Sequence, residues 1–258
     1  MIKSERQYHI DLAHGDVGEY VILPGDPGRC ESIAKHFNKP KFVTQKREFV
    51  TWSGELCGVK VGVTSTGIGG PSAAIAIEEL IKCGAHTFIR VGTCGGIDTK
   101  VIGGDIIIAT AAVRGDGTSD EYLVPDYPAA ADFEVTSALK QAAEKNKLRH
   151  HIGVVQSKDS FYGEVAPESM PVEARLKARW DCFVRAGCLG SEMEAATLMC
   201  VGLTRKVRVG AVLTAIWNVE RPKAGLDNPE YHSSDRAIKC AIDALKILIK
   251  PPSRRGQC

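Results

Sequence analysis

The chain has 258 residues, with 44% hydrophobic and 25% charged side chains and a formal net charge of +2 at pH 7. This composition is ordinary for a globular protein, and the length allows a substantial core. A net charge so close to zero gives no reason to expect nucleic acid or an acidic membrane surface as a partner. No uncharged stretch reaches the length of a membrane-spanning helix, so the sequence predicts no membrane insertion either.

Cysteine usage indicates a reducing compartment. Nine cysteines are present, an odd number with irregular spacing and no CxxC pair. The residues before position 7 lack the apolar run of a signal peptide. Both observations favour a cytoplasmic location with free thiols. The seven histidines show no metal-binding spacing such as HExxH, so the sequence predicts no metal centre from them.

Strand-like and helix-like segments alternate along the chain without internal repeats, low-complexity tracts or linker-like stretches. Such alternation predicts an α/β fold. We expect a single domain over residues 1–250, with a central mixed β-sheet flanked by helices. Residues 251–258 are expected to form a disordered tail.

The first element is a short strand over residues 20–23, followed by the sequence PGDPGR. Asp26 is a suitable N-cap and Pro27 a suitable first helical residue, which predicts a helix through residues 33–34. Arg29 then lies in the first turn, where a cation opposes the helix dipole. An anion bound at this helix N-terminus would explain that position, and a solvated surface arginine is the alternative.

Two strand-like segments and a glycine-rich turn come next. Residues 42–52 and 59–65 alternate like strands, with Arg47 inside the first. The turn TGIGGPS follows, and then an amphipathic helix through residue 80. The turn is not a Walker A loop, because no Gly-Lys-Ser/Thr ends it, and its glycine spacing differs from GxGxxG. A dinucleotide-dependent oxidoreductase is therefore disfavoured.

The following strand, at residues 87–91, is apolar except for Arg90 and leads into the turn GTCGG. A buried guanidinium needs an anionic partner. Ligands collect at the carboxyl ends of strands in open α/β sheets. We therefore expect Arg90 and Thr93 to hold an anionic group, with a structural salt bridge to a nearby carboxylate as the alternative.

The rest of the chain continues the alternation and closes with a helix. Strands are expected at residues 105–112, 152–156 and 207–217, helices at 131–146, 172–183, 195–202 and 234–249, and a loop at 159–163.

Two carboxylates near the start of the helix at residues 195–202 have two interpretations. Glu192 and Glu194 flank Met193, and a carboxylate accepts hydrogen bonds from a vicinal diol such as that of a ribose. The pattern Ser191-x-x-Glu194 is also a capping box, which we regard as the more frequent meaning of such a pattern.

Several motifs, in the same order and over nearly the whole chain, resemble those of the nucleoside phosphorylase family, which includes the hexameric purine nucleoside phosphorylases. They are GDPGR at residues 25–29, REF at 47–49, STGIGGPS at 65–72, RVGTCG at 90–95, FEV at 133–135 and EME at 192–194. Members that act on uridine are the most similar. The resemblance implies a single α/β domain that cleaves uridine with inorganic phosphate to uracil and ribose 1-phosphate, a step of pyrimidine salvage.

The resemblance also implies residue roles. The phosphate-binding residues would be Gly25, Arg29, Arg47, Arg90 and Thr93, and the ribose-binding residues His9, Glu192, Met193 and Glu194. Arg90, Glu194 and Arg29 would carry the catalysis. His9 and Arg47 would reach the site of a neighbouring subunit, in a hexamer built from dimers. A monovalent cation such as K⁺ is expected between subunits near Glu48, Ile68 and Ser72, and no cofactor is required.

The base is assigned less directly. The purine enzymes of the family have an aspartate where this chain has Asn218, which favours a pyrimidine. The glutamine and arginine that read uracil in the uridine enzymes are missing, so we expect Glu164 to accept from uracil N3–H and Arg221 to donate to a carbonyl. Adjacent aromatics either stack on a base or fill a core or surface. The base-binding residues are expected to be Cys94, Gly95, Phe161, Tyr162, Glu164, Trp217, Asn218 and Arg221.

Other functions remain open alongside uridine cleavage. The main alternative is a purine nucleoside phosphorylase acting on inosine or guanosine, or a member with altered base specificity. A nucleosidase that uses water would not need several phosphate-binding arginines. A non-catalytic nucleoside-binding protein would bind without turnover.

Overall fold

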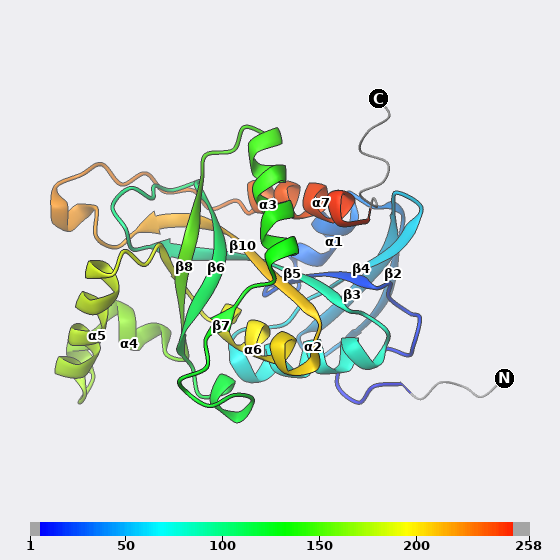
Figure 1. Ribbon diagram of the computed structural model, residues 1–258, viewed down its shortest axis with the longest axis horizontal. Helices are drawn as coiled ribbons and strands as arrows, with labels where there is room; N and C mark the ends of the chain where they lie inside the picture. Colours follow the sequence, from blue (N-terminus) through cyan, green and yellow to red (C-terminus); the bar gives the residue numbers. More distant parts are fainter. Residues whose placement is uncertain (1–5, 250–258) are drawn as a thin grey trace.

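A computed structural model describes residues 6–249, which form one mixed β-sheet with helices packed against it (Figure 1). The predicted α/β class is confirmed. The strands are β1 Tyr20–Pro24, β2 Asn38–Lys46, β3 Phe49–Leu56, β4 Val59–Thr64, β5 Thr87–Gly96, β6 Ile106–Gly115, β7 Ala129–Ala130, β8 His150–Lys158, β9 Gly190–Glu192 and β10 Arg208–Asn218. The helices are α1 Arg29–Ala34, α2 Gly70–Lys82, α3 Phe133–Lys145, α4 Phe161–Val165, α5 Glu173–Arg185, α6 Ala195–Arg205 and α7 Asp235–Ile249. The expected tail at residues 251–258 lies outside the described residues.

The sheet closes on itself in one half and stays open in the other. Its strand order is β10-β6-β8-β9-β5-β1-β4-β3-β2, with β10 also paired to β5 and β7 paired to β6. Strands β5, β10, β6, β8 and β9 therefore form a closed ring, and β1, β4, β3 and β2 extend from β5. Closure removes the exposed edges that an open sheet would leave.

The central strand β5 changes its neighbour part-way along. Its first half pairs in parallel with β1, as far as Val91 opposite Pro24. Its last residues pair with β9, where Gly95 lies opposite Ser191. Between these pairings, one edge of β5 is left unpaired within the described residues. A ligand site is expected where neighbouring strands diverge in this way.

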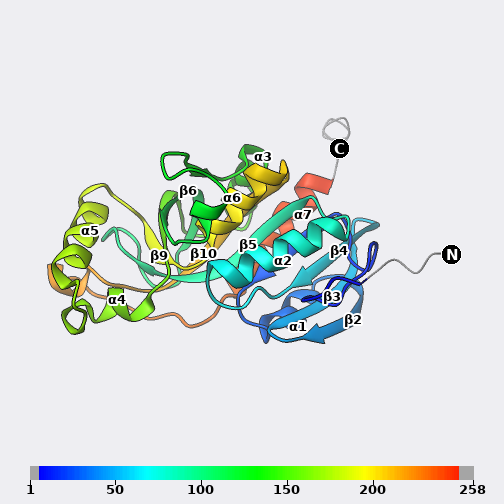
Figure 2. The ribbon, with the colours of Figure 1, turned by 90° about the horizontal axis from the view of Figure 1, so that it is seen from below.

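Alternate residues of the buried strands serve two cores on opposite faces of the sheet. Phe88 of β5 belongs to the core that includes Leu80 of α2 and Leu198 of α6. The next residue, Ile89, belongs to the core that includes Leu139 of α3 and Leu245 of α7. Figure 2 shows α2 and α6 side by side on their face of the sheet. Both faces of β5 are therefore covered, which holds its carboxyl end in place.

The helix predicted from Pro27 begins two residues later. Its first residue is Arg29, and its N-cap is Gly28. Asp26 Oδ1 accepts a hydrogen bond from the Gly28 N–H at 2.8 Å. Asp26 thus closes a turn before the helix instead of capping it.

Two predicted strand boundaries are also wrong. Residues 42–52 form two antiparallel strands, β2 and β3, because the chain reverses at Arg47, whose φ of 54° is left-handed. The strand expected to end at residue 91 continues to Gly96, because β10 pairs with β5 along its whole length. The small residues that suggested a turn therefore lie in a strand.

The segment after β8 is helical where a loop was expected. Ser160 Oγ accepts from the Gly163 N–H at 2.9 Å and caps the short helix α4. Helix α5 follows and buries none of its residues. In Figure 1, α4 and α5 stand beside the closed part of the sheet. Residues of both helices line a cavity.

Candidate active site

A cavity of about 1460 Å³ opens at the carboxyl ends of β1 and β5 and extends to α4 and α5. This volume exceeds that of most small-molecule sites, so it can hold a ligand larger than phosphate. The cavity brings together most of the residues predicted to form a site. The predicted phosphate, ribose and base residues in its lining are Gly25, Arg29, Arg90, Thr93, Cys94, Gly95, Phe161, Glu164, Glu192, Met193, Glu194 and Trp217, and the residues expected near a cation, Glu48, Ile68 and Ser72, line it too.

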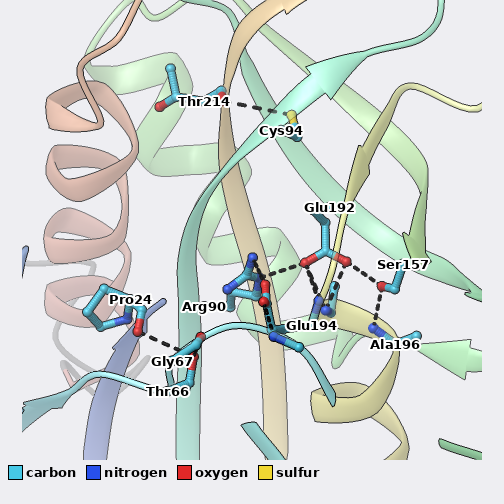
Figure 3. Close-up of polar contacts among 12 residues, drawn as sticks. Pro24, Thr66, Gly67, Arg90, Cys94, Ser157, Glu192, Glu194, Ala196 and Thr214 are labelled. Atoms are coloured by element: carbon cyan, nitrogen blue, oxygen red, sulfur yellow. Dashed lines mark hydrogen bonds and ion pairs between the residues drawn. The ribbon is translucent and has the colours of Figure 1, made fainter. Parts of the chain in front are cut away.

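Arg90 lies on β5 and is only 4% exposed, between two carboxylates (Figure 3). Its Nε donates to Glu192 Oε2 at 2.8 Å, and its Nη2 pairs with Glu194 Oε2. We call Arg90, Glu192 and Glu194 the Arg90 cluster. Burial opposes the charge on Arg90, but the carboxylates of Glu194 and Glu192 outweigh burial and raise its pKa. The salt bridge considered as an alternative is therefore present.

One nitrogen of Arg90 is left over. Among the described residues, Arg90 Nη1 is buried without a hydrogen-bond partner. A Cβ added at Gly25 would lie 4.0 Å from this nitrogen, so the end of β1 borders it. A buried donor without a partner is costly. An acceptor atom of a ligand in the cavity would remove that cost, so the anion interpretation survives beside the salt bridge.

Arg29 adds a second guanidinium at the same end of the cavity. Burial lowers the pKa of Arg29, and although Asp26 opposes this shift, the like charge of Arg90 lowers the pKa further. The two guanidinium groups therefore repel each other. An oxyanion between them would relieve that repulsion.

The start of α6 is capped by Glu192 and not by the predicted capping box. Glu192 Oε2 accepts from the backbone N–H groups of Glu194 and Ala195, both at 2.9 Å. Glu194 makes no side-chain cap. Instead, the Gly69 N–H donates to its Oε1 at 2.6 Å. Burial raises the pKa of Glu194, against the influence of Arg90.

A second polar cluster lines the cavity beside the first. Lys158 Nζ lies 3.0 Å from Glu164 Oε1 and 2.5 Å from Ser191 Oγ. Gln156 Nε2 donates to Ser191 Oγ at 2.8 Å and to Glu164 Oε2. We call Gln156, Lys158, Glu164 and Ser191 the Lys158 cluster; of these only Glu164 was predicted. Gln156 and Lys158 are two positions apart at the end of a strand, so their side chains point to the same face of the sheet. This alternation was the signal from which both residues could have been predicted.

Two predicted residues that were assigned to a neighbouring subunit lie outside the cavity of their own chain. His9 Nδ1 is 2.6 Å from Glu79 Oε1, near the start of the described residues. Arg47 is exposed at the turn between β2 and β3. Both lie near Glu48, which does line the cavity, so they border the site without entering it.

Three predicted base-binding residues are also absent from the cavity lining. Asn218 is fully buried, where its Nδ2 donates to the carbonyls of Asp98 and Val101. Arg221 donates to the backbone carbonyls of Asp227 and Thr99, and Tyr162 is exposed to solvent. Asn218 thus anchors a loop, and the predicted donor role of Arg221 lacks support.

Oxygen atoms gather where the monovalent cation was expected. Ser72 Oγ lies 2.7 Å from Glu48 Oε1 and 2.5 Å from the Thr66 carbonyl oxygen, and its single proton can be donated to either of them. The hydrogen bond from Ser72 lowers the pKa of Glu48, which keeps the carboxylate ionised. Carboxylate, hydroxyl and carbonyl oxygens suit a hard cation. Within residues 6–249, no group of three or more His, Cys, Asp and Glu side chains is placed to hold a metal ion.

A family model described as the phosphorylase superfamily matches residues 19–249. The chain belongs to this superfamily. It is 51% identical to the uridine phosphorylase of Treponema pallidum over 98% of both chains. It is 38% identical to the uridine phosphorylase of Escherichia coli, over 96% of this chain and 100% of the other. It is 36% identical to the guanosine phosphorylase of Halorubrum lacusprofundi, over 94% of this chain and 99% of the other.

Membership of the phosphorylase superfamily confirms the resemblance inferred from the motifs. The match covers every strand and helix of the structure, so no second fold unit is needed to explain the described residues. No helix in residues 6–249 has the length and apolarity needed to span a membrane.

Proposed function

We propose that the chain catalyses the phosphorolysis of uridine, in which inorganic phosphate displaces uracil from the ribose and leaves ribose 1-phosphate. The observation that carries the proposal is the unpartnered Nη1 of Arg90, buried in the cavity next to Gly25 and accompanied by Arg29. Uridine phosphorylases from distant organisms match the chain along nearly its full length, which supports uridine as the nucleoside.

The residues explain how such a reaction proceeds. Phosphate lies against Arg90 Nη1 and Arg29, because guanidinium donors suit tetrahedral oxyanions. A phosphate oxygen bonds to C1′ as the bond from C1′ to the base breaks, and the electron pair leaves with the base. The ribose carries positive charge in the transition state, as in other glycosyl transfers. The fixed phosphate and the carboxylate of Glu194 stabilise that charge.

The test is the release of base from uridine, thymidine, inosine, guanosine and adenosine, with and without phosphate. We expect phosphate-dependent cleavage of uridine with ribose 1-phosphate as the second product. Cleavage that is equally fast without phosphate would identify a nucleosidase and contradict the proposal. Tight binding without any turnover would identify a nucleoside-binding protein.

Guanosine or inosine is the second candidate substrate. The guanosine phosphorylase of Halorubrum lacusprofundi matches the chain at 36% identity. The structure also removes one argument against purines, since Asn218 does not line the cavity within the described residues. Cleavage of guanosine in preference to uridine in the same assay would select this candidate.

The proposal includes a hexamer built from dimers, with His9 and Arg47 completing the site of a neighbouring subunit. Neither residue lines the cavity of its own chain, which is the observation in favour. The oxygens of Glu48 and Ser72 would hold a monovalent cation such as K⁺ near Ile68. A cytoplasmic location is also part of the proposal, supported by the eight free cysteines in residues 6–249.

If neighbouring subunits share their active sites, two inactive variants should restore each other's activity when they are mixed. Arg47→Ala and Glu194→Gln subunits, mixed and allowed to exchange, should form dimers in which one of two sites has both residues. Random pairing then gives about a quarter of the wild-type activity. The measurement is activity after refolding the variants together and separately.

The matched control mixes Glu194→Gln with Thr93→Ala, because both residues line the cavity of one chain. Every site in that mixture keeps a defect, so no activity should return. Recovery in the control, or none with Arg47→Ala, would show that Arg47 does not act in a neighbouring site.

A further inference from the structure

We propose that the Lys158 cluster reads the base, and that it selects bases in which a ring N–H lies next to a carbonyl. This inference rests on the proposed phosphorolysis and concerns the part of the substrate that the Arg90 cluster does not hold. In the assignment from sequence, Glu164 was to act with Arg221, whose guanidinium instead binds the carbonyls of Asp227 and Thr99.

The Lys158 cluster is built, mostly buried and open to the cavity. The side chains of Lys158 and Glu164 are 12% and 11% exposed, and both line the cavity. Ser191 Oγ accepts from Gln156 and Lys158 and donates to Glu164 Oε2 at 2.6 Å, which uses its full hydrogen-bonding capacity. Gln156 and Ser191 therefore fix the positions of Lys158 and Glu164.

Lys158 keeps one hydrogen-bond donor unused, and Glu164 keeps one acceptor lone pair unused. The ammonium of Lys158 has three N–H donors, of which Glu164 and Ser191 take two. Glu164 Oε1 accepts only from Lys158 among the hydrogen bonds of the described residues, so it has a free lone pair. A spare donor and a spare acceptor thus lie side by side, on atoms 3.0 Å apart.

That arrangement complements one class of base. Uracil presents N3–H next to a carbonyl, and hypoxanthine and guanine present N1–H next to C6=O, so each gives a donor to Glu164 and an acceptor to Lys158. Cytosine and adenine present a bare ring nitrogen and an amino group at these positions. Their ring nitrogen would face a carboxylate, which only accepts hydrogen bonds. The cluster therefore favours oxo bases and rejects amino bases, whether pyrimidine or purine.

The position of the cluster fits a nucleoside that spans both ends of the cavity. Ser191 and Glu192 are consecutive in β9, about 3.3 Å apart along a strand, and they serve the Lys158 and Arg90 clusters respectively. Lys158 Nζ also lies 5.8 Å from the centre of the Phe161 ring, which borders the same space. As the base leaves, its electron pair spreads to the carbonyl oxygen, where the charge of Lys158 stabilises it.

The experiment compares kcat/KM for uridine, cytidine, inosine and adenosine in the wild type and in two variants. Glu164→Gln replaces an acceptor by a group that both donates and accepts, so the preference for uridine over cytidine should fall about 10- to 100-fold. Lys158→Met should lower kcat/KM for uridine by about 10- to 100-fold with little change for cytidine. Lys246→Met is the matched control, because Lys246 pairs with Asp243 on α7 and lies outside the cavity lining.

Calorimetric binding of free uracil and cytosine gives a readout that does not depend on turnover. The inference is supported if the wild type binds uracil over cytosine and Glu164→Gln narrows the difference. Unchanged base preference in both folded variants overturns the inference while phosphorolysis stands. Equal use of cytidine and uridine by the wild type also overturns it. Failure of the proposed function appears separately, as cleavage that does not need phosphate.

Discussion

Replacing Arg90 by alanine is expected to raise the KM for phosphate sharply and to lower kcat/KM by about 10²–10³-fold. The loss follows from the removal of Nη1, the buried donor that faces the cavity without a partner in the described residues. Steady-state kinetics with phosphate varied at saturating uridine measure the effect. Unchanged dependence on phosphate would show that Arg90 only neutralises Glu192 and Glu194.

The same substitution also affects folding. It leaves two buried carboxylates unpaired, and breaking a buried ion pair costs about 3–5 kcal/mol of the free energy of unfolding. Arg90→Lys separates the two effects, since it keeps the charge but not the forked donors that fit an oxyanion. We expect Arg90→Lys to fold and still to have a higher KM for phosphate than the wild type.

Arg114 is the matched control for Arg90. Its side chain is 7% exposed and its Nη2 donates to Asp120 Oδ1 at 2.7 Å, but it does not line the cavity in the part of the chain described. Arg114→Ala should destabilise the fold and leave the KM for phosphate of the folded protein unchanged. A raised KM in this control would indicate that lost stability, and not lost phosphate contact, explains the effect at Arg90.

The ligand-facing residues could be predicted best where a charged residue interrupted a segment whose apolar pattern indicated burial. An arginine inside an apolar strand requires an anion, and this requirement led to Arg90 before any contact was known. Its partners were not foreseen. Glu192 meets Arg90 across 102 positions of sequence, and it lies on the three-residue strand β9, which is too short to show a periodic pattern.

Predictions failed where long-range contacts decide what a side chain does. Arg221 and Asn218 are close in sequence to the cavity residue Trp217, yet their polar groups bind backbone carbonyls elsewhere. Lys158 was passed over because the strand was expected to end at residue 156, which left the lysine outside the strand. The observed strand β8 runs to Lys158 and points it at Glu164.

Replacing Glu194 by glutamine is expected to lower kcat/KM for the nucleoside by about 10²–10³-fold without raising the KM for phosphate. The carboxylate stabilises positive charge on the ribose, and glutamine lacks that charge. Phosphate binding should hold or improve, because a negative group next to the dianion is removed. This pattern is the opposite of that expected for Arg90→Ala, so the two variants together distinguish a ribose role from a phosphate role.

Stability must be measured alongside, since Glu194 accepts from both Gly69 and Arg90. Glutamine has one carbonyl oxygen, so one of these donors would face an NH₂ group, at a cost of about 1–3 kcal/mol. Asp105→Asn is the matched control. Asp105 is also buried, its Oδ2 lies 2.8 Å from His151 Nε2, and it does not line the cavity within residues 6–249.

We expect the Asp105 variant to lose stability and keep its activity. The cap at the start of α6 belongs to Glu192, so Glu194→Gln should leave that helix intact. If activity in the Glu194 variant fell only in proportion to its unfolded fraction, Glu194 would be a structural partner of Arg90. A loss of turnover in fully folded protein, with phosphate affinity preserved, assigns the carboxylate to the transition state.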